Sequence, residues 1–586
     1  MNRNIYLGID IGGTWLKGIV FEWNGNKPFS TMPEMVKTLQ VAKVKSRLAE
    51  DAVLNDFVSA LDNLTAQLIM TDDCVKGIGI STAGIVDYHG KRLLTASKHL
   101  RVLLDQGWTD YLQNRFGASV IIINDAEAAA IGAASLGYLN GNRIIGIMPV
   151  GTGLGFSVWR NGRRWTPNFS LPLLGCIYTP EGYYDSLSSA AILSNFDKEG
   201  NLCNIFIKDE YRPHREKYIR DLAGIISTAH IIYGADKILI GGGLAEALAA
   251  IDFPIDKLIM TELKKEALLT SPLVEVQLMS EGNLLPLIGS ALLAVGEAKA
   301  QYSRLQREYA AFNTEKPYSE TLRLNKFSST ELIRVLWQTE QEAGLNLESS
   351  IAEIATVVEK LTTSLFDGGR LIYVGAGTSG RLAAIDAVEI ACTFGFPREK
   401  VLTLIAGGIA DAGIDIETRF EEDASCVPDL LYANVSEKDV VIGISASGSA
   451  YYVQSALGFA KSIGAYCVMI QEEVSEVLPF CDTVIALRSG NEVLAGSTRM
   501  KAGTATKKVL NFLSTSVMVK LGKVHGCYMT DLECINEKLI KRAEFILNVL
   551  FDIDQKQAYQ VLQDHHFSLN QAINSLKLKK EHLNGK

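Results

Sequence analysis

Short apolar runs alternate with longer amphipathic stretches along most of the chain, which is the pattern of an α/β protein. In the second half these runs predict strands at residues 370–374, 401–405, 439–444, 465–470 and 483–486. Helical stretches separate most of them, and parallel strands need such crossovers, so a parallel sheet is predicted. The first half also alternates strands and helices, with frequent glycine turns.

A charged stretch with few glycines separates the two halves, at residues 296–324. It begins as a helical pattern and breaks near Pro317, so we place the main domain boundary here. A helical segment then precedes the second α/β pattern, and the end of the chain is amphipathic and helical. The predicted divisions are a first domain at 1–300, a linker at 301–325, a second domain at 326–545 and a helical subdomain at 546–586.

The composition excludes several classes of protein. With 586 residues the chain has room for about four structural units, and a hydrophobic content of 47% excludes intrinsic disorder. The 57 Lys and Arg residues are outnumbered by 66 Asp and Glu residues, and there is no basic run. We therefore expect neither a nucleic acid nor a membrane surface as a partner.

The cysteines and the N-terminus predict a cytoplasmic protein. Nine cysteines without a C-x-x-C pair fit reduced thiols better than disulfides or a Cys-rich zinc site. Asp10 interrupts the chain before a signal-type apolar region could develop. No apolar stretch approaches the ~20 residues of a membrane span.

The first chemical motif is a strand, a tight turn and a returning strand near the N-terminus, YLGIDIGGTWLKGIVFE. The turn is Gly12-Gly13-Thr14. Glycines let backbone amides approach phosphate oxygens, and Thr14 adds a hydroxyl donor. Asp10 precedes the turn, where its carboxylate could hold Mg²⁺ directly or through water. Alone the motif is a modest signal, because Asp-Gly turns also occur in ordinary hairpins.

Two more glycine turns strengthen this interpretation. One is Gly151-Thr152-Gly153, again between two strands, and the other follows a strand at Gly242-Gly243. The three turns together resemble the actin-like sugar kinase superfamily, and within it the ROK group of repressors and sugar kinases. The resemblance implies two duplicated α/β lobes around a nucleotide cleft, with Mg-ATP as cofactor. The first two turns would hold the phosphates, and the third would lie near adenosine.

A carboxylate lies between the first two turns, in VIIINDAEAAAIG. A strand ends at Asn124-Asp125 and a helix of small residues begins. In the resembling family the aspartate of this pair, here Asp125, is the general base for in-line phosphoryl transfer to a sugar hydroxyl. The alternative is a helix N-cap, which Asn and Asp both favour. The family often carries a Cys-rich zinc loop after the second turn, and this chain lacks one, so no zinc is expected.

The second half contains a G-x-G-x-x-G motif in RLIYVGAGTSGR, after a strand and before a helix. Taken literally it is a dinucleotide fingerprint, which requires an acidic residue about 20 positions later at the end of the next strand. That strand ends in IAGG without one, so NAD is not expected. The hydroxyls of Thr378 and Ser379, with Gly377 at the start of the helix, suit a single phosphate monoester instead.

A second turn of this kind follows in DVVIGISASGSAYYV. It places Ser445, Ser447 and Ser449 around Gly448 after another strand. Each turn alone could be a Ser-rich helix cap. The pair resembles the sugar isomerase (SIS) fold and predicts a sugar-phosphate site.

Further segments occur in one order: DAVEIACTFG, an IAGG turn, an EED run, SASGSAYYV and GSTRMKAGTATKKVLN. Together they resemble N-acetylmuramic acid 6-phosphate etherase, from about Thr314 to the C-terminus. A eukaryotic glucokinase regulator family shares similar segments. The resemblance implies a SIS-type parallel α/β sandwich with a small C-terminal helical subdomain. It also implies a homodimer through the SIS domain.

The etherase family removes D-lactate from carbon 3 of the amino sugar and leaves N-acetylglucosamine 6-phosphate. A carboxylate takes the carbon 2 proton, a second acid protonates the departing oxygen, and water adds, with no metal or redox cofactor. By motif position Glu389 matches the proton donor, and Glu422 matches the second glutamate, with Glu421 as the alternative. Arg499 and Lys501 are candidates to face the phosphate or carboxylate of the substrate. Apolar neighbours of Glu389 argue against an ordinary solvated side chain.

The two halves constrain each other, because the etherase needs a 6-phosphorylated sugar and the first half resembles a sugar kinase. The leading hypothesis is a bifunctional enzyme of cell-wall amino-sugar recycling. It would phosphorylate N-acetylmuramic acid at carbon 6, with N-acetylglucosamine as a second candidate substrate, and then release D-lactate. One alternative is a kinase fused to a non-catalytic SIS sensor. Another is an aldose–ketose isomerase, which leaves the etherase-type motifs unexplained.

Overall fold

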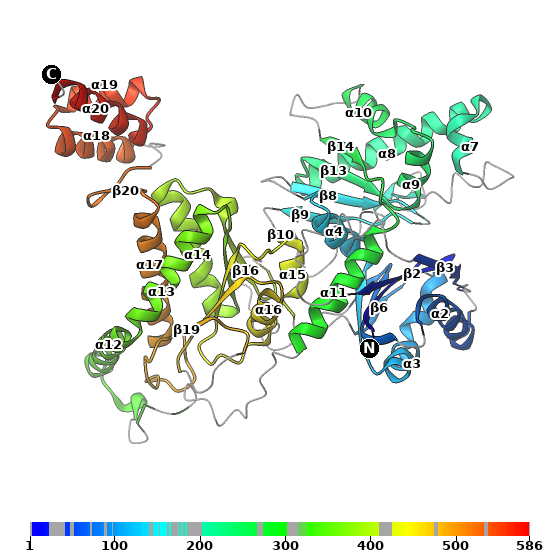
Figure 1. Cartoon of the computed structure of the whole chain (residues 1–586), viewed down its shortest axis with the longest axis horizontal. Coiled ribbons are helices and arrows are strands. Elements are labelled where there is room, and N and C mark those ends of the chain that lie inside the picture. The colour runs from blue at the N-terminus through cyan, green and yellow to red at the C-terminus, as the bar shows by residue number, and fades with distance from the viewer. Residues whose placement is uncertain are drawn as a thin grey trace. The chain divides into compact units, whose positions relative to one another are not determined.

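The computed structural model divides the chain into two compact units, which are described separately here (Figure 1). The first unit comprises Met1–Arg304 with 407–437 and 458–464, and the second comprises the remaining residues. The domain limits expected from the sequence stay predictions. The structure describes the chain except for residues 1–2, 23–40, 47, 49–51, 71–72, 87–90, 97, 140–143, 152, 161–162, 166–173, 175–176, 180–181, 185–201, 266–273, 302–315, 317, 320–322, 409–424, 474–478, 532–536 and 585–586.

The first unit contains two five-stranded sheets with the same strand order, which confirms two duplicated α/β lobes. In the order of each sheet, the first three strands pair antiparallel with their neighbours, and the last three pair parallel. The first sheet has the order β3 (Val41–Lys45), β2 (Trp15–Glu22), β1 (Arg3–Ile11), β4 (Asp73–Thr82) and β7 (Ser119–Asn124). The second has the order β10 (Arg163–Trp165), β9 (Ser157–Arg160), β8 (Ile144–Pro149), β13 (Lys237–Gly241) and β14 (Glu275–Leu278).

Helices cover these sheets, and each lobe has its own apolar core. The helices of the first unit are α2 (Leu54–Leu68), α3 (Gly107–Phe116), α4 (Asp125–Ser135), α7 (Leu202–Ile207), α8 (Arg212–Tyr233), α9 (Gly242–Ala250), α10 (Ile255–Lys265), α11 (Leu285–Gln301) and α15 (Val427–Tyr432). Tyr432 of α15 donates a hydrogen bond from its hydroxyl to the carbonyl of Glu127 in α4 at 2.9 Å.

Glycines let α11 lie directly on the first sheet. A Cβ on Gly79 would lie 1.8 Å from the carbonyl oxygen of Ser290, and one on Gly8 would lie 2.4 Å from that of Leu287. Because those oxygens belong to the helix backbone, the helix and sheet would have to separate to admit any side chain. The glycines therefore set the spacing between α11 and the strands that lead to the first turn.

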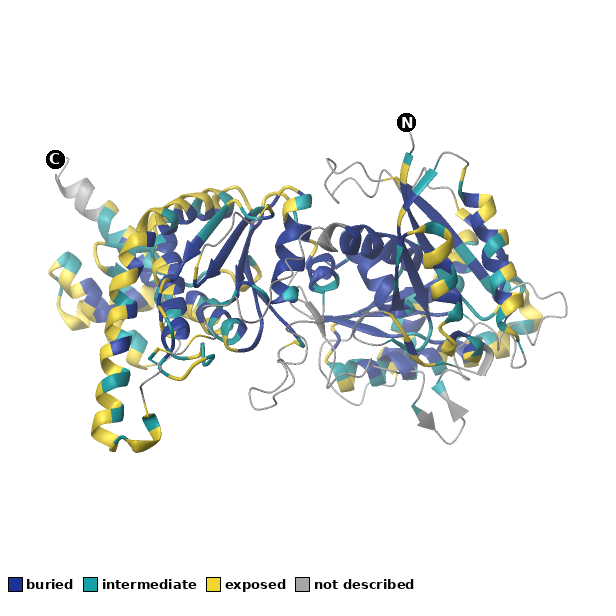
Figure 2. Cartoon of the chain, turned by 90° about the horizontal axis from the view of Figure 1, so that it is seen from below, coloured by how far each residue is buried: buried dark blue, intermediate teal, exposed yellow. Residues whose placement is uncertain are grey.

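The second unit contains one sheet of five parallel strands, which are largely buried except for half of the edge strand Thr483–Ala486 (Figure 2). Its order is β16 (Val401–Ile405), β15 (Leu371–Gly375), β17 (Val440–Ile444), β18 (Tyr466–Gln471) and β19 (Thr483–Ala486). All five strands were expected from the sequence, and each bound agrees within one residue. Burial on both faces explains why they read as continuous apolar runs.

The long helical segment expected before this sheet is two helices. Ser328 caps the first through a capping box with Glu331, and a 3₁₀ turn at Leu347–Ser350 separates it from the second. The helices outside the first unit include α12 (Ser329–Asn346), α13 (Ile351–Phe366), α14 (Gly377–Phe394) and α17 (Lys501–Lys520). The C-terminal helices α18 (Glu537–Phe551), α19 (Gln555–Asp564) and α20 (Leu569–Asn584) enclose a separate small core. A further helix, α16 (Tyr451–Ser462), follows β17.

Candidate functional sites in the two units

The first glycine turn joins β1 to β2 and is fixed from a neighbouring strand. The amide of Gly12 donates to the carbonyl of Trp15 at 3.0 Å. Ser46, just after β3, donates from Oγ to the carbonyl of Gly13 at 2.7 Å and from its amide to that of Thr14 at 3.1 Å. Thr14 is thus an exposed residue at the end of a hairpin whose backbone is fixed by these hydrogen bonds.

Asp10 lies on β1, two residues before this turn. The surroundings of its carboxylate suit a cation. Ser81 donates to Oδ1 at 2.9 Å, and Nζ of Lys17 lies 3.5 Å from Oδ2. The side chain of Asp10 is 14% exposed. Mg²⁺ in nucleotide sites is commonly held by one or two carboxylates together with substrate phosphates. The carboxylate of Asp10, two residues before the first glycine turn, is chemically suited to such an ion.

The second and third glycine turns touch each other. The amide of Val150 donates to the carbonyl of Gly241 at 3.0 Å, and within the second turn Gly151 donates to the carbonyl of Gly153 at 2.9 Å. Gly242 has a positive φ of 78°, and a Cβ there would lie 2.5 Å from the carbonyl oxygen of Val150. Only glycine fits this contact without a shift of the backbone.

The N-cap role that the sequence left open belongs to Asn124, and the general-base role of Asp125 stays a prediction. Asn124 is the N-cap of α4, since its Oδ1 accepts from the amides of Ala126 at 2.9 Å and Glu127 at 3.3 Å. Asp125 is the first residue of the helix, and its Oδ1 accepts from the Ala126 amide at 2.8 Å. Asn124 is in register with Thr82, which pairs with the last residue of β1. Asp125 therefore follows a strand that ends at the same sheet edge as Asp10.

The second lobe reaches the start of α4 as well. Ser157, on the strand after the second turn, donates from Oγ to the carbonyl of Ala126 at 2.9 Å. A Cβ on Gly155 would lie 3.2 Å from Cβ of Ala126. The residue next to Asp125 is thus in contact with the second hairpin. Thr152, expected among the phosphate ligands, lies outside the described residues.

In the second unit the two Ser/Gly turns follow adjacent strands. Gly375 at the end of β15 pairs with Ile444 at the end of β17, so both turns lie at the carboxyl edge of the sheet. The first turn leads into α14, where Gly377 has a φ of 51° and Thr378 is exposed. Ser379 is half-buried. Ligands of open parallel sheets bind at this edge.

The second Ser/Gly turn is held by its own hydroxyls and by α16. Oγ of Ser447 and Oγ of Ser449 are 2.6 Å apart, and Gln454 donates to the carbonyl of Gly448 at 2.8 Å. Ser445 is buried, with its amide bonded to β18. Gly448 has a φ of 73°.

The first turn of α17 packs against the first turn of α14. A Cβ on Gly503 would lie 4.0 Å from a side-chain carbon of Thr378. Lys501, which begins α17, is only 2% exposed, and its ammonium lies 5.3 Å from the centre of the Tyr318 ring. The structure therefore brings the first turn of α17, at Gly503, beside the first Ser/Gly turn, while the Lys501 side chain is buried.

Two buried glutamates near Lys501 were not expected from the sequence. Glu492 accepts from the amides of Lys501 at 3.2 Å and Ala502 at 3.0 Å, and so caps α17. Glu472 accepts from the amide and hydroxyl of Ser489 at 2.9 Å and 2.6 Å. Burial raises the pKa of both carboxyls. No local pattern marks them, because their burial depends on strands and loops that only the fold brings together.

Glu389 is not buried, contrary to the expectation from its apolar neighbours. Its side chain is 56% exposed and pairs with Lys507 of α17 at 2.7 Å. The adjacent Val388 is also exposed, at 57%. Successive helix positions are about 100° apart, so neighbours in sequence do not determine which way Glu389 faces.

One turn earlier on α14, Asp386 is buried. Its carboxylate accepts from the hydroxyl of Tyr373 at 3.0 Å and that of Ser514 at 3.2 Å, and Lys507 lies 3.5 Å away. Burial raises the pKa of Asp386. Lys507 therefore joins one buried and one exposed carboxylate of the same helix. Glu421 and Glu422, the candidates for the second etherase carboxylate, lie outside the described residues.

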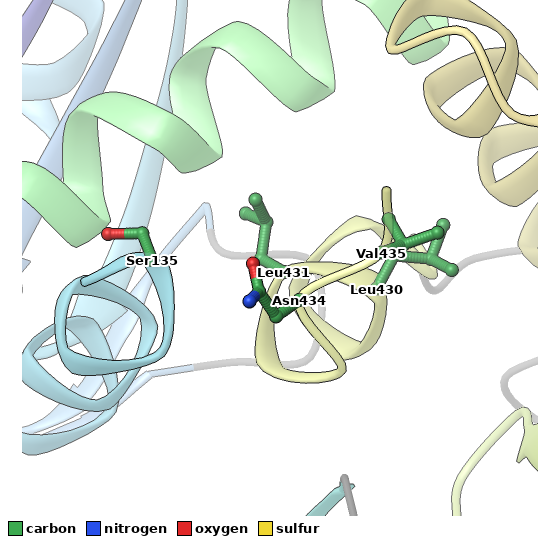
Figure 3. A pocket seen from close by; sticks show the side chains of 5 residues that line it. All are labelled: Ser135, Leu430, Leu431, Asn434 and Val435. Atoms are coloured by element: carbon green, nitrogen blue, oxygen red, sulfur yellow. The ribbon is translucent and has the colours of Figure 1, made fainter. Parts of the chain in front are cut away.

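A small pocket in the first unit contains none of these groups. Ser135, Leu430, Leu431, Asn434 and Val435 line it (Figure 3). At about 10 Å³ it has room for roughly one water molecule. Among the described residues no three or more His, Cys, Asp or Glu side chains are grouped to hold a metal ion. No described helix has the length and apolar character to cross a membrane.

Two family models match separate parts of the chain. The ROK family model matches residues 6–170. The model described as the glucokinase regulatory protein N-terminal SIS domain matches residues 353–461. These matches agree with the order of the two kinds of turn.

Solved structures similar to the chain include a ROK family glucokinase from Streptomyces griseus, with 19% identity and a TM-score of 0.41. The match covers 50% of this chain and 99% of that one. A putative N-acetylmannosamine kinase from Listeria monocytogenes has 15% identity and a TM-score of 0.39, over 50% of this chain and 99% of that one.

Curated relatives are more similar. The N-acetylmuramic acid 6-phosphate etherase of Petrotoga mobilis is 42% identical over 250 residues, which cover 42% of this chain and 84% of the relative. That of Actinobacillus pleuropneumoniae is 38% identical over 288 residues, 44% of this chain and 95% of the relative. The chain therefore belongs to the N-acetylmuramic acid 6-phosphate etherase family and carries a ROK family domain ahead of its SIS domain.

Proposed function

We propose that the chain is a bifunctional enzyme that phosphorylates an amino sugar and then cleaves its lactyl ether. The first unit would transfer the γ-phosphoryl group of ATP to the carbon 6 hydroxyl of N-acetylmuramic acid, with N-acetylglucosamine as a second candidate substrate. The second would convert N-acetylmuramic acid 6-phosphate to N-acetylglucosamine 6-phosphate and D-lactate. This sequence of reactions belongs to cytoplasmic recycling of cell-wall sugars.

In the kinase step, Asp125 would accept the proton of the attacking hydroxyl as that oxygen bonds to the phosphorus. Its place at the start of α4, after a strand that ends at the same sheet edge as Asp10, supports this role. The glycine turns would hold the nucleotide phosphates through backbone amides. Asp10 would hold Mg²⁺, which neutralises charge on the phosphates when bound.

In the etherase step, the open-chain aldehyde makes the carbon 2 proton removable. A carboxylate, proposed to be Glu422, would take that proton, and Glu389 would give a proton to the lactate oxygen as the carbon 3–oxygen bond breaks. Water then adds at carbon 3 of the unsaturated aldehyde. The turns at Gly377–Ser379 and Ser445–Ser449 would hold the 6-phosphate, and Lys501 would supply positive charge nearby.

The observation that carries the proposal is the side-by-side placement of the two Ser/Gly turns, on adjacent strands of a chain whose first unit has three glycine turns and Asp125. A kinase product with a 6-phosphate is what a phosphate-binding etherase needs. The two sites on one chain are thus chemically consecutive.

The test is D-lactate release from unphosphorylated N-acetylmuramic acid, with and without Mg-ATP. Lactate that forms only with ATP supports both activities. Asp125→Asn should lower this release by about 10²–10⁴-fold, the usual range for a general base, while release from the 6-phosphate should be unchanged. Absence of lactate from the supplied 6-phosphate would sink the etherase assignment.

A second candidate is a kinase fused to a non-catalytic SIS sensor of sugar phosphates. The match of residues 353–461 to the glucokinase regulatory protein SIS domain favours it. A sensor would bind the sugar phosphate and alter kinase activity without lactate release. Glu389→Gln should leave those properties intact in a sensor, whereas it should remove lactate release from an etherase.

We also propose that the second unit forms a homodimer. Exposed apolar side chains on α12, α14 and α17 support this proposal: Ile333, Trp337, Ile385, Val388 and Phe512. Exposed apolar groups on a helix surface favour burial against a partner. Light scattering should give a mass twice that of one chain. Val388→Glu should reduce the measured mass to that of one chain, whereas Ile232→Glu on α8 should leave it unchanged.

A further inference from the structure

A polar row crosses the first sheet directly below the first glycine turn. Lys43 on β3 pairs with Lys17 on β2, Lys17 pairs with Asp10 on β1, and Asp10 pairs with Ser81 on β4. Residues in register lie on the same face of a sheet. Two positions earlier along β1, at Gly8, the same face carries α11. The polar row therefore lies on the same face of the sheet as α11, just beyond the part of β1 that contacts this helix.

Lys17 is the centre of a chain of contacts that connects the two lobes of the first unit. Its ammonium lies 3.5 Å from Oδ2 of Asp10 and donates to Oδ1 of Asn283 at 3.1 Å. Asn283, just before α11, donates from Nδ2 to Glu246 on α9. Asn283 also lies within 4 Å of a Cβ placed on Gly243, in the third turn. The two strands that flank the first turn are thus connected to the third turn through one lysine and one amide.

The position of Lys17 suits a nucleotide ligand better than a purely structural ion pair. Its side chain is 20% exposed and so is not sealed into a core. It shares the Asp10 carboxylate that would hold a divalent cation. A metal ion at this carboxylate would weaken its attraction for Lys17 and leave the ammonium beside the phosphate turn, since two cations compete for one negative charge.

We infer that Lys17 is a phosphate-binding residue of the kinase site. Without nucleotide it neutralises Asp10, and when metal and nucleotide bind it leaves Asp10 and faces the terminal phosphate. There it stabilises the negative charge on the phosphoryl oxygens during transfer. Asn283 accepts a hydrogen bond from the ammonium and is itself held by Glu246. This inference rests on the proposed kinase function.

The first experiment measures sugar phosphorylation by Lys17→Met and Lys17→Arg in the full chain. Loss of one preorganised electrostatic group lowers kcat by about 10²–10³-fold. We expect that loss for Lys17→Met, with a smaller change in KM for the sugar and partial recovery in Lys17→Arg. Lys43→Met is the control, because Lys43 lies in the same row but its ammonium is 4.3 Å from the centre of the Trp15 ring. A kcat within threefold of wild type in Lys17→Met would overturn the inference.

A second experiment measures binding of Mn²⁺ alone by electron paramagnetic resonance. Removal of the Lys17 ammonium should free Asp10 and tighten Mn²⁺ binding several-fold, whereas Lys43→Met should not. Unchanged Mn²⁺ affinity in Lys17→Met contradicts the exchange of partners at Asp10. Lactate release from supplied N-acetylmuramic acid 6-phosphate and the thermal unfolding curve check that each variant is folded.

Failure of the kinase proposal can be recognised separately. If wild type phosphorylates no amino sugar, calorimetric binding of Mg-ATP is compared between the variants. Weaker binding in Lys17→Met than in Lys43→Met still supports the role of Lys17 at the phosphates. Equal binding overturns it.

Discussion

Lys507 on α17 holds Glu389 on α14 in an ion pair, with Nζ 2.7 Å from Oε2. The contact places a positive charge beside the carboxyl proposed to donate a proton to lactate. Glu389→Gln should lower lactate release by about 10²–10⁴-fold, since general acids contribute in that range. Lys507→Met should cause a smaller loss and alter the pH profile of the reaction, measured with N-acetylmuramic acid 6-phosphate.

The control for this prediction is a second glutamate–lysine pair on α17. Lys520 lies 2.7 Å from Glu359 of α13, and both side chains are exposed. Glu359→Gln and Lys520→Met should leave lactate release within about twofold of wild type, because exposed ion pairs contribute little. Equal losses in both pairs would mean that Glu389 acts only through folding.

Gly448→Ala should disturb the second Ser/Gly turn. The residue has a φ of 73°, and the added methyl would lie 2.4 Å from Oε1 of Gln471. Gln471 cannot move freely, because its amide donates to the carbonyl of Glu473 at 2.6 Å. The KM for the sugar 6-phosphate should rise about tenfold, which corresponds to ~1.4 kcal/mol of binding, as measured by initial rates.

The matched change is Gly522→Ala, at a φ of 75° with nothing within 4 Å of the new methyl. Both variants should lose about 1–2 kcal/mol of stability from the left-handed backbone. Only Gly448→Ala should change KM. A similar rise in Gly522→Ala would show that general destabilisation, not the turn, controls substrate binding.

Gly79→Ala should destabilise the first unit by about 3 kcal/mol or more, at the upper end of overpacking effects. The methyl would lie 1.8 Å from the Ser290 carbonyl oxygen of α11, so helix and sheet must separate. Gly224→Ala in α8 has nothing within 4 Å and should instead stabilise by about 0.5–1 kcal/mol. Thermal unfolding measures both. If both substitutions changed the free energy of unfolding in the same direction, the close contact described between α11 and the sheet would be contradicted.

Asp386 should make stability fall as pH rises. Burial raises its pKa, so the folded protein binds this proton more tightly than the unfolded chain does. The stability from this group is full below the ordinary aspartate pKa of about 4 and is lost as pH rises through the folded pKa. Asp386→Asn should therefore flatten the decline in stability that denaturant unfolding measures as the pH rises above about 4.

Asp73 should show the opposite dependence. Its hydrogen bonds with Arg3 lower the pKa of the carboxyl. The stability from this group is present above the ordinary pKa and is lost as pH falls through the lowered one. Asp73→Asn should therefore reduce the loss of stability on acidification. The same direction of change in Asp73→Asn and Asp386→Asn would contradict these assignments.

The architecture could be predicted because its signals are local. Strands such as Val440–Ile444 are buried on both faces and so appear as apolar runs. The phosphate turns could be found because glycines and hydroxyls cluster at strand ends. The exposure of Glu389 could not be found this way, because it depends on which face of α14 meets α17.

The contact of Lys17 with Asn283 is a second feature that could not be predicted from the sequence. The two residues are 266 positions apart, and neither belongs to a glycine turn. Glu492 was missed for a similar reason, since its burial depends on α17 and Lys501. Such side chains have ordinary sequence neighbours, and their chemistry arises only from tertiary packing.

The backbone contacts of Gly8 and Gly79 with α11 also restrict how this molecule can diversify. At these positions a larger residue in the sheet cannot be offset by a smaller one in the helix, because the opposing atoms are carbonyl oxygens. This part of the sheet is therefore closed to substitution by larger residues. Sequence change is less restricted in loops that do not contact α11, where a new side chain leaves the spacing of α11 intact.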